Sequence, residues 1–171
     1  KKLKTLEGNA VRPTSDHIKE SLFNILQFDI EGRIFLDLFA GSGQIGLEAL
    51  SRGAERAVFV DSAKASCAVV EDNIRTTDFT LKATVVHSDF NAYLMRTKEQ
   101  FDIAFLDPPY RTGVLEKALL AVVSHMNRGG IVICEHPTDE PLPEKAGEFV
   151  RIKDYRYGKI LLTSYRHESM V

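Results

Sequence analysis

Short apolar segments alternate with amphipathic segments along most of the chain. Runs of mostly apolar residues predict strands at 34–39, 56–60, 82–87, 101–106 and 131–134, the first of them buried. Apolar residues at helical spacing predict helices at 15–27, 44–52, 64–75, 90–97 and 114–126. Because strands that alternate with helices are joined by right-handed crossovers, the pattern indicates a mostly parallel sheet with helices on both faces.

The last part of the chain departs from this alternation. After a proline-containing loop at 137–145, two strand-like segments, 148–154 and 159–165, flank Tyr157-Gly158. This pattern is typical of an antiparallel hairpin. We therefore predict an α/β, Rossmann-like fold with a seven-stranded sheet, in which the hairpin supplies the last two strands.

The composition is that of an ordinary globular protein. The chain has 171 residues, of which 44% are hydrophobic and 27% charged. We predict a single domain over 1–171, with a basic segment and helix at 1–30 and the Rossmann-like core at 31–171. No apolar run approaches the roughly 18 residues of a membrane span, so we expect no membrane contact, and we expect a monomer.

Cysteine and histidine residues give no sign of a metal site. Cys67 and Cys134 lie in apolar contexts without ligand spacing, which favours buried free thiols in a reducing cytoplasm. The five histidines are scattered along the chain. We therefore expect a cytoplasmic protein without a structural or catalytic metal.

Basic residues gather at both ends of the chain, although the formal net charge is −2. They are Lys1, Lys2, Lys4 and Arg12 at the start, and Arg151, Lys153, Arg156, Lys159 and Arg166 at the end. The global balance does not indicate a nucleic-acid-binding protein. The two segments could simply be solvated, but a local basic rim is compatible with RNA.

A glycine-rich loop follows the first predicted strand. Gly41, Gly43 and Gly46 have the GxGxxG spacing between a strand and a helix. Glycines allow the backbone to turn sharply and to approach a ligand, and the helix N-terminus offers free N–H groups. This context favours a nucleotide-type cofactor over a plain strand-to-helix turn.

An aspartate follows or ends each of the first four predicted strands, and the set helps to choose the cofactor. Asp61 stands where dinucleotide-binding and S-adenosylmethionine-binding folds both place an acid for the ribose hydroxyls. Asp37, before the glycine loop, would repel a pyrophosphate and favours a cationic ligand. Asp89 could accept the adenine amino group, and Asp107 completes the row. The row suits a phosphate-free nucleoside that carries a sulfonium, so we expect S-adenosylmethionine.

The fourth predicted strand ends in the motif Asp107-Pro108-Pro109-Tyr110. Proline fixes φ and lacks an N–H, so two prolines form a rigid segment that does not continue a sheet. The segment would hold a carboxylate, a carbonyl and a ring at the edge where open α/β sheets bind ligands. A rigid strand exit with a capping aspartate would explain the prolines but not the whole set.

These motifs together resemble those of the class I S-adenosylmethionine-dependent methyltransferases. In that resemblance DLFAGSG, which includes Phe39, is the cofactor loop, and DPPY is the signature of amino-group methylation. VRPTSDHIKESLFNIL followed by FLDLFAGSGQIGLEALSRGA is similar to the bacterial family that methylates guanine N2 in 16S ribosomal RNA. The chain departs from that family at His17, where arginine is commoner, and the given sequence does not include the short glycine-containing basic segment that members usually have before KLKTLEG.

The resemblance implies that the DPPY motif is catalytic. Asp107 and the Pro108 carbonyl would accept the two N–H groups of the target amine, align its nitrogen and stabilise developing positive charge. Pro109 would limit backbone drift. Tyr110 would stack on the target base, which must be unpaired or flipped out of its helix.

The resemblance also implies roles around the motif. Arg12 and Thr14 would lie across the methionine end of the cofactor or near the RNA, or would simply lead into the first helix. Phe90 would pack on the adenine or in the core, and Arg111 would contact phosphate.

Other functions remain open from the sequence. An adenine-N6 or cytosine-N4 methyltransferase acting on DNA generally carries a target-recognition insertion, for which 171 residues leave no room. Protein glutamine methylation usually goes with Asn rather than Asp at position 107. An NAD(P)-dependent oxidoreductase or a non-catalytic RNA-binding module would leave DPPY unexplained. The RNA substrate could be naked 16S RNA, a ribonucleoprotein particle or the small subunit.

Overall fold

The computed structural model describes residue 3 and residues 15–171. Its helices are α1 (Asp16–Ile25), α2 (Gln44–Ser51), α3 (Lys64–Thr76), α4 (Phe90–Arg96) and α5 (Val114–Val122). Its strands are β1 (Ile34–Asp37), β2 (Arg56–Asp61), β3 (Ala83–His87), β4 (Phe101–Leu106), β5 (Met126–Pro137), β6 (Lys145–Ala146), β7 (Phe149–Tyr157) and β8 (Ile160–His167).

The strands form one sheet in the order β3-β2-β1-β4-β5-β8-β7-β6. The first five pair in parallel, and β8, β7 and β6 are antiparallel to their neighbours. The predicted α/β fold with a terminal hairpin is therefore confirmed. The sheet has one strand more than the seven predicted. The additional strand, β6, is only two residues long, which is too short to produce a periodic pattern in the sequence.

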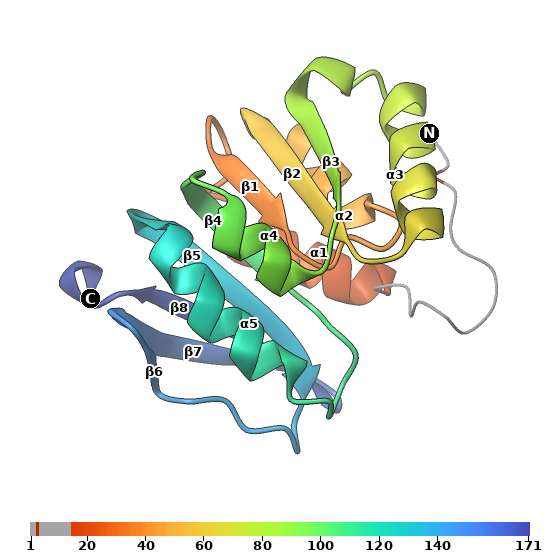
Figure 1. The fold of residues 1–171 in the computed structure, drawn as a ribbon. Coiled ribbons are helices and arrows are strands. Elements are labelled where there is room, and N and C mark those ends of the chain that lie inside the picture. Colours follow the sequence, from red (N-terminus) through yellow and green to blue (C-terminus); the bar gives the residue numbers. More distant parts are fainter. Residues whose placement is uncertain (1–2, 4–14) are drawn as a thin grey trace.

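The helices cover both faces of the parallel part of the sheet (Figure 1). Phe35, Phe59 and Phe105 point to the face where α1, α2 and α3 pack. Leu36 and Leu106, which follow Phe35 and Phe105 directly, point to the other face, where α4 and α5 pack. Successive residues of each central strand are thus buried on opposite faces, which explains their continuous apolar runs.

Strand β5 extends furthest beyond its predicted bounds, while β7 and β8 run three and two residues past theirs. The sequence predicts a turn at Gly129-Gly130 and a strand only at 131–134, whereas β5 begins at Met126 and ends at Pro137. A Cβ at Gly130 would lie 2.7 Å from the carbonyl oxygen of Asp102 on β4. Glycine is needed at this position for the close approach of the two strands, and the predicted turn corresponds to an irregularity in the β4–β5 pairing between Met126 and Ile131 rather than to a chain reversal.

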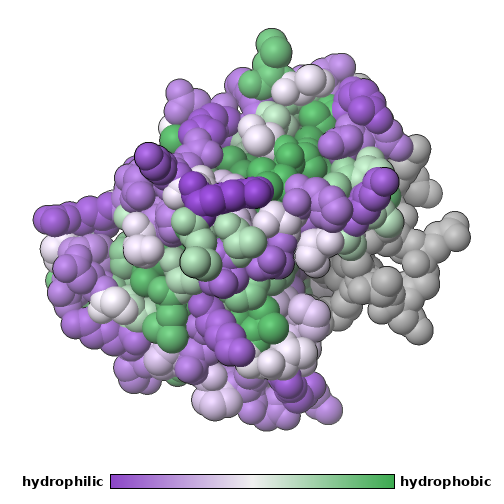
Figure 2. Space-filling model, in the orientation of Figure 1, coloured by the Kyte–Doolittle hydropathy of each residue, from purple (hydrophilic) through white to green (hydrophobic). Residues whose placement is uncertain are grey.

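Several large apolar side chains are exposed among the described residues. Figure 2 shows hydrophobic residues in separate spots among hydrophilic ones on the face that α4 and α5 cover. Leu81, Met95 and Leu120 are among the exposed ones. Cys67 and Cys134 are free and buried, as predicted. Within the described part of the chain, no helix has the length and hydropathy to cross a membrane.

Candidate active site

The carboxyl ends of the parallel strands meet at one edge of the sheet and bring four aspartates together. In sheet order they are Asp89 after β3, Asp61 on β2, Asp37 on β1 and Asp107 after β4. Asp37 pairs in register with Phe59 and Phe105, so Asp61 and Asp107 lie two residues further along the neighbouring strands. At about 3.3 Å per residue, these two stand about 7 Å further outward than Asp37, on either side of it.

The glycine loop is hydrogen-bonded to two of these carboxylates. The Gly41 N–H donates to Asp61 Oδ2 at 2.9 Å, and the Gly46 N–H donates to Asp37 Oδ2 at 3.1 Å. Gly41 and Gly43 have φ of 57° and 83°, where glycine is strongly favoured. From α3, the buried Asn73 donates to the Ser42 carbonyl at 3.0 Å. Hydrogen bonds to Asp37, Asp61 and Asn73 thus hold the loop that we predict to bind the cofactor.

Gly46 allows α2 to pack closely on the sheet. A Cβ at this position would lie 2.3 Å from Cε2 of Phe59 on β2. The third glycine of the motif therefore has a packing role, while the other two shape the turn.

Asp37 is a buried acid, with only 1% of its surface exposed. Burial raises the pKa of its carboxyl from 3.8 to about 7; the Gly46 N–H opposes this shift and the nearby Asp61 charge adds to it. A positively charged ligand would stabilise the ionised form. The site is therefore suited to a cation and unsuited to a phosphate.

Asp61 and Asp89 also hold protein groups in place. The second oxygen of Asp61, Oδ1, accepts the Ala63 N–H at 2.9 Å, and Asp89 caps α4 by accepting the Ala92 N–H at 2.9 Å. Each carboxylate oxygen has two lone pairs, so these bonds leave acceptor capacity for a ligand.

Two aromatic rings lie next to this acidic row. Phe39 and Phe90 pack on each other with ring centroids 5.6 Å apart, and both are only partly buried against the core. Core packing and an apolar wall for a planar ligand are therefore both compatible with Phe90.

The DPPY motif leaves β4 at the same edge of the sheet. Pro108 is buried and Pro109 exposed, while Asp107 and Tyr110 are half-buried. The Tyr110 hydroxyl donates to Oε2 of Glu135 at 2.6 Å. Glu135 lies on β5 and is 3% exposed, so this is a charge-assisted hydrogen bond in a largely dry environment. One end of the tyrosine ring is thereby fixed.

Arg111 has its charge compensated within the protein. Its guanidinium binds both carboxylate oxygens of Asp139 at 2.9 to 3.3 Å. Its N–H donates to Oε1 of Glu140 at 2.7 Å, and its φ of 58° is left-handed. The loop after β5 therefore holds the chain directly behind the DPPY motif. A phosphate would have to displace Asp139 to bind this guanidinium.

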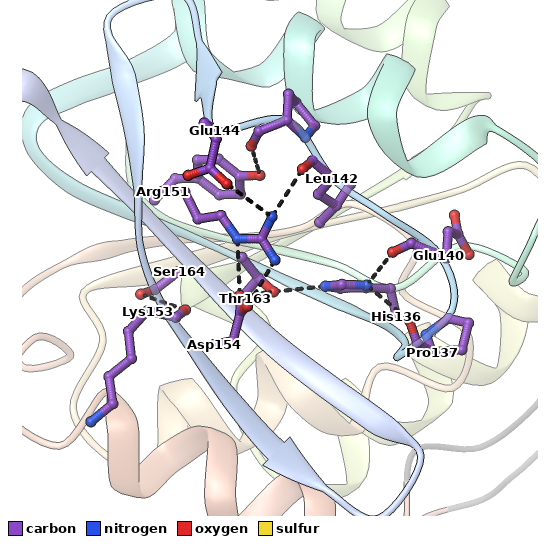
Figure 3. Close-up of polar contacts among 12 residues, drawn as sticks. His136, Pro137, Glu140, Leu142, Glu144, Arg151, Lys153, Asp154, Thr163 and Ser164 are labelled. Carbon is purple, nitrogen blue, oxygen red and sulfur yellow. Dashed lines mark hydrogen bonds and ion pairs between the residues drawn. The ribbon is translucent and has the colours of Figure 1, made fainter.

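A polar network fixes that loop to the terminal hairpin (Figure 3). The buried His136 ring lies 2.9 Å from the Glu140 carbonyl through Nδ1 and 2.7 Å from the Thr163 hydroxyl through Nε2. Thr163 donates to Asp154, which also pairs with Arg151 at 2.8 Å. Partial burial works against the Asp154 charge, but hydrogen bonds from Arg151 and Thr163 outweigh it and lower the pKa. Hydrogen bonds and an ion pair thus hold the loop after β5 on the terminal hairpin.

Sequence reasoning missed several residues of this site. Glu135 had the same signal as Asp37, an acid at the carboxyl end of an apolar strand. Asn73 and Glu140 had none, because their partners are distant in the chain. Arg12 and Thr14 lie outside the described residues. No group of His, Cys, Asp and Glu within residues 15–171 is placed to hold a metal ion.

Comparisons with known proteins find relatives that match nearly the whole chain. The family model described as conserved hypothetical protein 95 matches residues 1–166. YlbH of Bacillus subtilis is 37% identical over 170 residues, which cover 96% of this chain and 92% of that protein. Ribosomal RNA small subunit methyltransferase D of Escherichia coli K12 is 32% identical over 174 residues, with coverages of 99% and 86%. The solved structure of Escherichia coli yhhF superimposes with a TM-score of 0.86 and 30% identity, covering 98% of this chain and 92% of that one.

Proposed function

We propose that this chain, which belongs to the family of the ribosomal RNA small subunit methyltransferase D proteins, methylates the N2 amino group of a guanine in 16S ribosomal RNA with S-adenosylmethionine. One structural observation carries the proposal. The acidic row, the glycine loop and the DPPY motif share the carboxyl edge of one parallel sheet. Ligands of open α/β sheets bind at this edge.

The residues present fit S-adenosylmethionine better than a dinucleotide. The cofactor supplies a methyl group on a positively charged sulfonium. Asp37 is buried and gains from a nearby cation, whereas a pyrophosphate would raise its pKa further. Asp61 would hold the ribose hydroxyls and Asp89 the adenine amino group, with Phe39 and Phe90 as the apolar wall.

The DPPY motif would position the acceptor amine. The guanine amino nitrogen is a weak nucleophile because its lone pair is delocalised into the ring. Asp107 and the Pro108 carbonyl would accept its two N–H groups, orient the nitrogen, and stabilise the charge that develops there. Pro109 has no N–H that could compete for these acceptors.

Tyr110 would cover the face of the guanine. Its ring is fixed at the hydroxyl by Glu135, so little conformational entropy would be lost when a base stacks on it. Base stacking on an aromatic ring contributes about 1–3 kcal/mol per base. The base must therefore be unpaired or flipped out before it reaches the motif.

The test uses 16S RNA and small-subunit particles from cells that lack this protein. We expect the purified enzyme to restore one N2-methylguanine, identified by mass spectrometry of nuclease digests. Asp107→Ala should abolish methyl transfer while S-adenosylmethionine binding and the unfolding temperature stay unchanged. Glu55→Ala, which removes an exposed acid before β2, is the matched control and should retain full activity.

Two results would overturn the proposal. Tight NAD(H) binding without any response to S-adenosylmethionine would exclude the cofactor. Undiminished turnover of Asp107→Ala would exclude the catalytic role of the motif.

A further inference from the structure

The turn of the terminal hairpin stands beside the catalytic edge. Leu106 on β4, Cys134 on β5 and Thr163 on β8 lie at the same level of the sheet. Because β8 runs antiparallel to β5, the chain reaches the turn three residues beyond this level, at Ile160. Figure 1 shows the β7–β8 turn at the end of the sheet where β5 also ends.

The register gives the position of the turn relative to Asp107. Asp107 is one residue beyond Leu106, whereas Tyr157, the partner of Ile160, is three residues beyond the same level. At about 3.3 Å per residue, Tyr157 stands about 7 Å further outward than Asp107. At about 4.8 Å per strand, β8 lies about 10 Å to the side of β4, and β7, which carries Arg156 and Tyr157, lies about 14 Å to that side. The β7–β8 turn therefore projects beyond the carboxyl edge of the sheet, to one side of the proposed guanine site.

The turn carries positive charge that no residue in the described part of the chain neutralises by an ion pair. Arg156 and Lys159 are exposed, and neither forms an ion pair with any residue that the structure describes. The Arg156 Nε donates to the Gly158 carbonyl at 2.9 Å, which fixes the guanidinium at the turn. By contrast, Arg151 and Arg166 pair with Asp154 and Asp29. Only some of the C-terminal basic residues are thus available to an outside ligand.

Two tyrosine rings of β7 lie on the α1 side of the hairpin, whereas Arg156, which stands between them, points to the other face. Tyr157 packs edge-on against His17 of α1, with ring centroids 5.7 Å apart, and is half-buried. The Lys153 ammonium lies 4.7 Å from the centre of the Tyr155 ring. Cations interleaved with aromatic rings are the surface chemistry of single-stranded nucleic acid binding.

We propose that the β7–β8 turn, with Arg156, Lys159 and Tyr157, binds the RNA backbone that flanks the target guanine. The inference rests on the proposed function, because the turn stands beside the amine-positioning motif. An anionic membrane would fit the charges but not their place at the rim of a catalytic edge. The two cations contact phosphates, and they position the RNA without reading its sequence.

The test compares two double variants of equal charge change. Arg156→Gln/Lys159→Gln removes the cations of the turn. Lys82→Gln/Arg128→Gln removes two exposed cations near the starts of β3 and β5, at the opposite edge of the sheet. Affinity for small-subunit particles and for 16S RNA is measured between 50 and 200 mM salt, together with KM, kcat and S-adenosylmethionine affinity.

We expect the turn variant alone to bind RNA about tenfold more weakly and to raise KM, with kcat and cofactor affinity unchanged. Loss of two phosphate contacts should reduce the slope of log affinity against log salt by about 1.4 to 1.8. Equal RNA affinity and equal salt dependence of the two double variants would overturn the inference about the turn. The proposed methyltransferase function would still stand if the wild-type protein methylates the RNA. Weaker binding of phosphatidylserine vesicles with unchanged RNA affinity would also overturn it. If RNA binding depends on the turn but no methylation occurs, the proposed methyltransferase function is refuted, while the proposed RNA-binding role of the turn is supported.

Discussion

Asp37→Asn tests whether burial controls the ionisation of the acid at the centre of the site. The Asp37 carboxyl is 1% exposed, and burial raises its pKa from 3.8 to about 7. Asparagine has nearly the same shape and can still accept the Gly46 N–H through its side-chain oxygen. The substitution therefore removes the titration of this group with little change in packing.

The expected effect depends on pH in a defined direction. Between pH 3.8 and about 7, the folded protein keeps a proton on Asp37 that the unfolded chain releases. The free energy of unfolding therefore falls as pH rises through this window, and the loss is complete above the folded pKa. A shift of about three pKa units corresponds to about 4 kcal/mol, of which about 2.5 kcal/mol should appear between pH 5 and pH 8.

Urea denaturation of the cofactor-free proteins at pH 5 and pH 8 measures this effect. Relative to wild type, Asp37→Asn should become more stable by about 2.5 kcal/mol at pH 8 than at pH 5. Any cost of burying the amide N–H groups is the same at both pH values and cancels. Asp78→Asn, the same change at an exposed position, should show no such difference. A stability difference that is independent of pH for Asp37→Asn would refute the reasoning.

Three further substitutions, with two double variants, test the glycine loop and the tyrosine anchor. Gly46→Ala should lower the free energy of unfolding by about 1–3 kcal/mol, because its Cβ would clash with the Phe59 ring. Gly46→Ala/Phe59→Leu should recover part of that loss in urea unfolding, and an additive loss would contradict the packing role. Glu135→Gln and Tyr110→Phe should each reduce kcat about tenfold in single-turnover assays, with cofactor affinity unchanged, since the ring loses its charge-assisted anchor of about 1.5–3 kcal/mol. Additive effects in the double variant would show that the two residues act separately.

The central fold could be predicted because its signals are local. Strands β1, β2 and β4 are buried on both faces and end at an aspartate or directly before one, so their apolar runs have clear bounds. The extension of β5 could not be predicted, because Gly130 reads as a turn until its neighbour on β4 is known. The two-residue β6 exists only through its pairing with Phe149 and Val150 on β7.

The candidate site also has features that the sequence predicts and features that only the fold reveals. The aspartates after the first four strands are visible in the sequence, because each ends an apolar run. The bonds that give Tyr110 and Arg111 their orientation are not, since Glu135 and Asp139 follow them by 25 and 28 residues. Nor does the sequence show that Asp37 and Asp61 hold the glycine loop, because that requires the positions of its N–H groups.

Glu135 extends the acidic row to the fifth parallel strand, so the negative charge that an entering RNA meets is larger. A carboxylate now stands at the carboxyl end of β3, β2, β1, β4 and β5 in turn. Such a row attracts a cationic cofactor but repels the phosphates that flank any guanine entering the site. Positive charge must therefore be supplied next to the row rather than within it. The β7–β8 turn is suited to this, because it begins one strand beyond Glu135 and carries Arg156 and Lys159 outward past the level of Asp107.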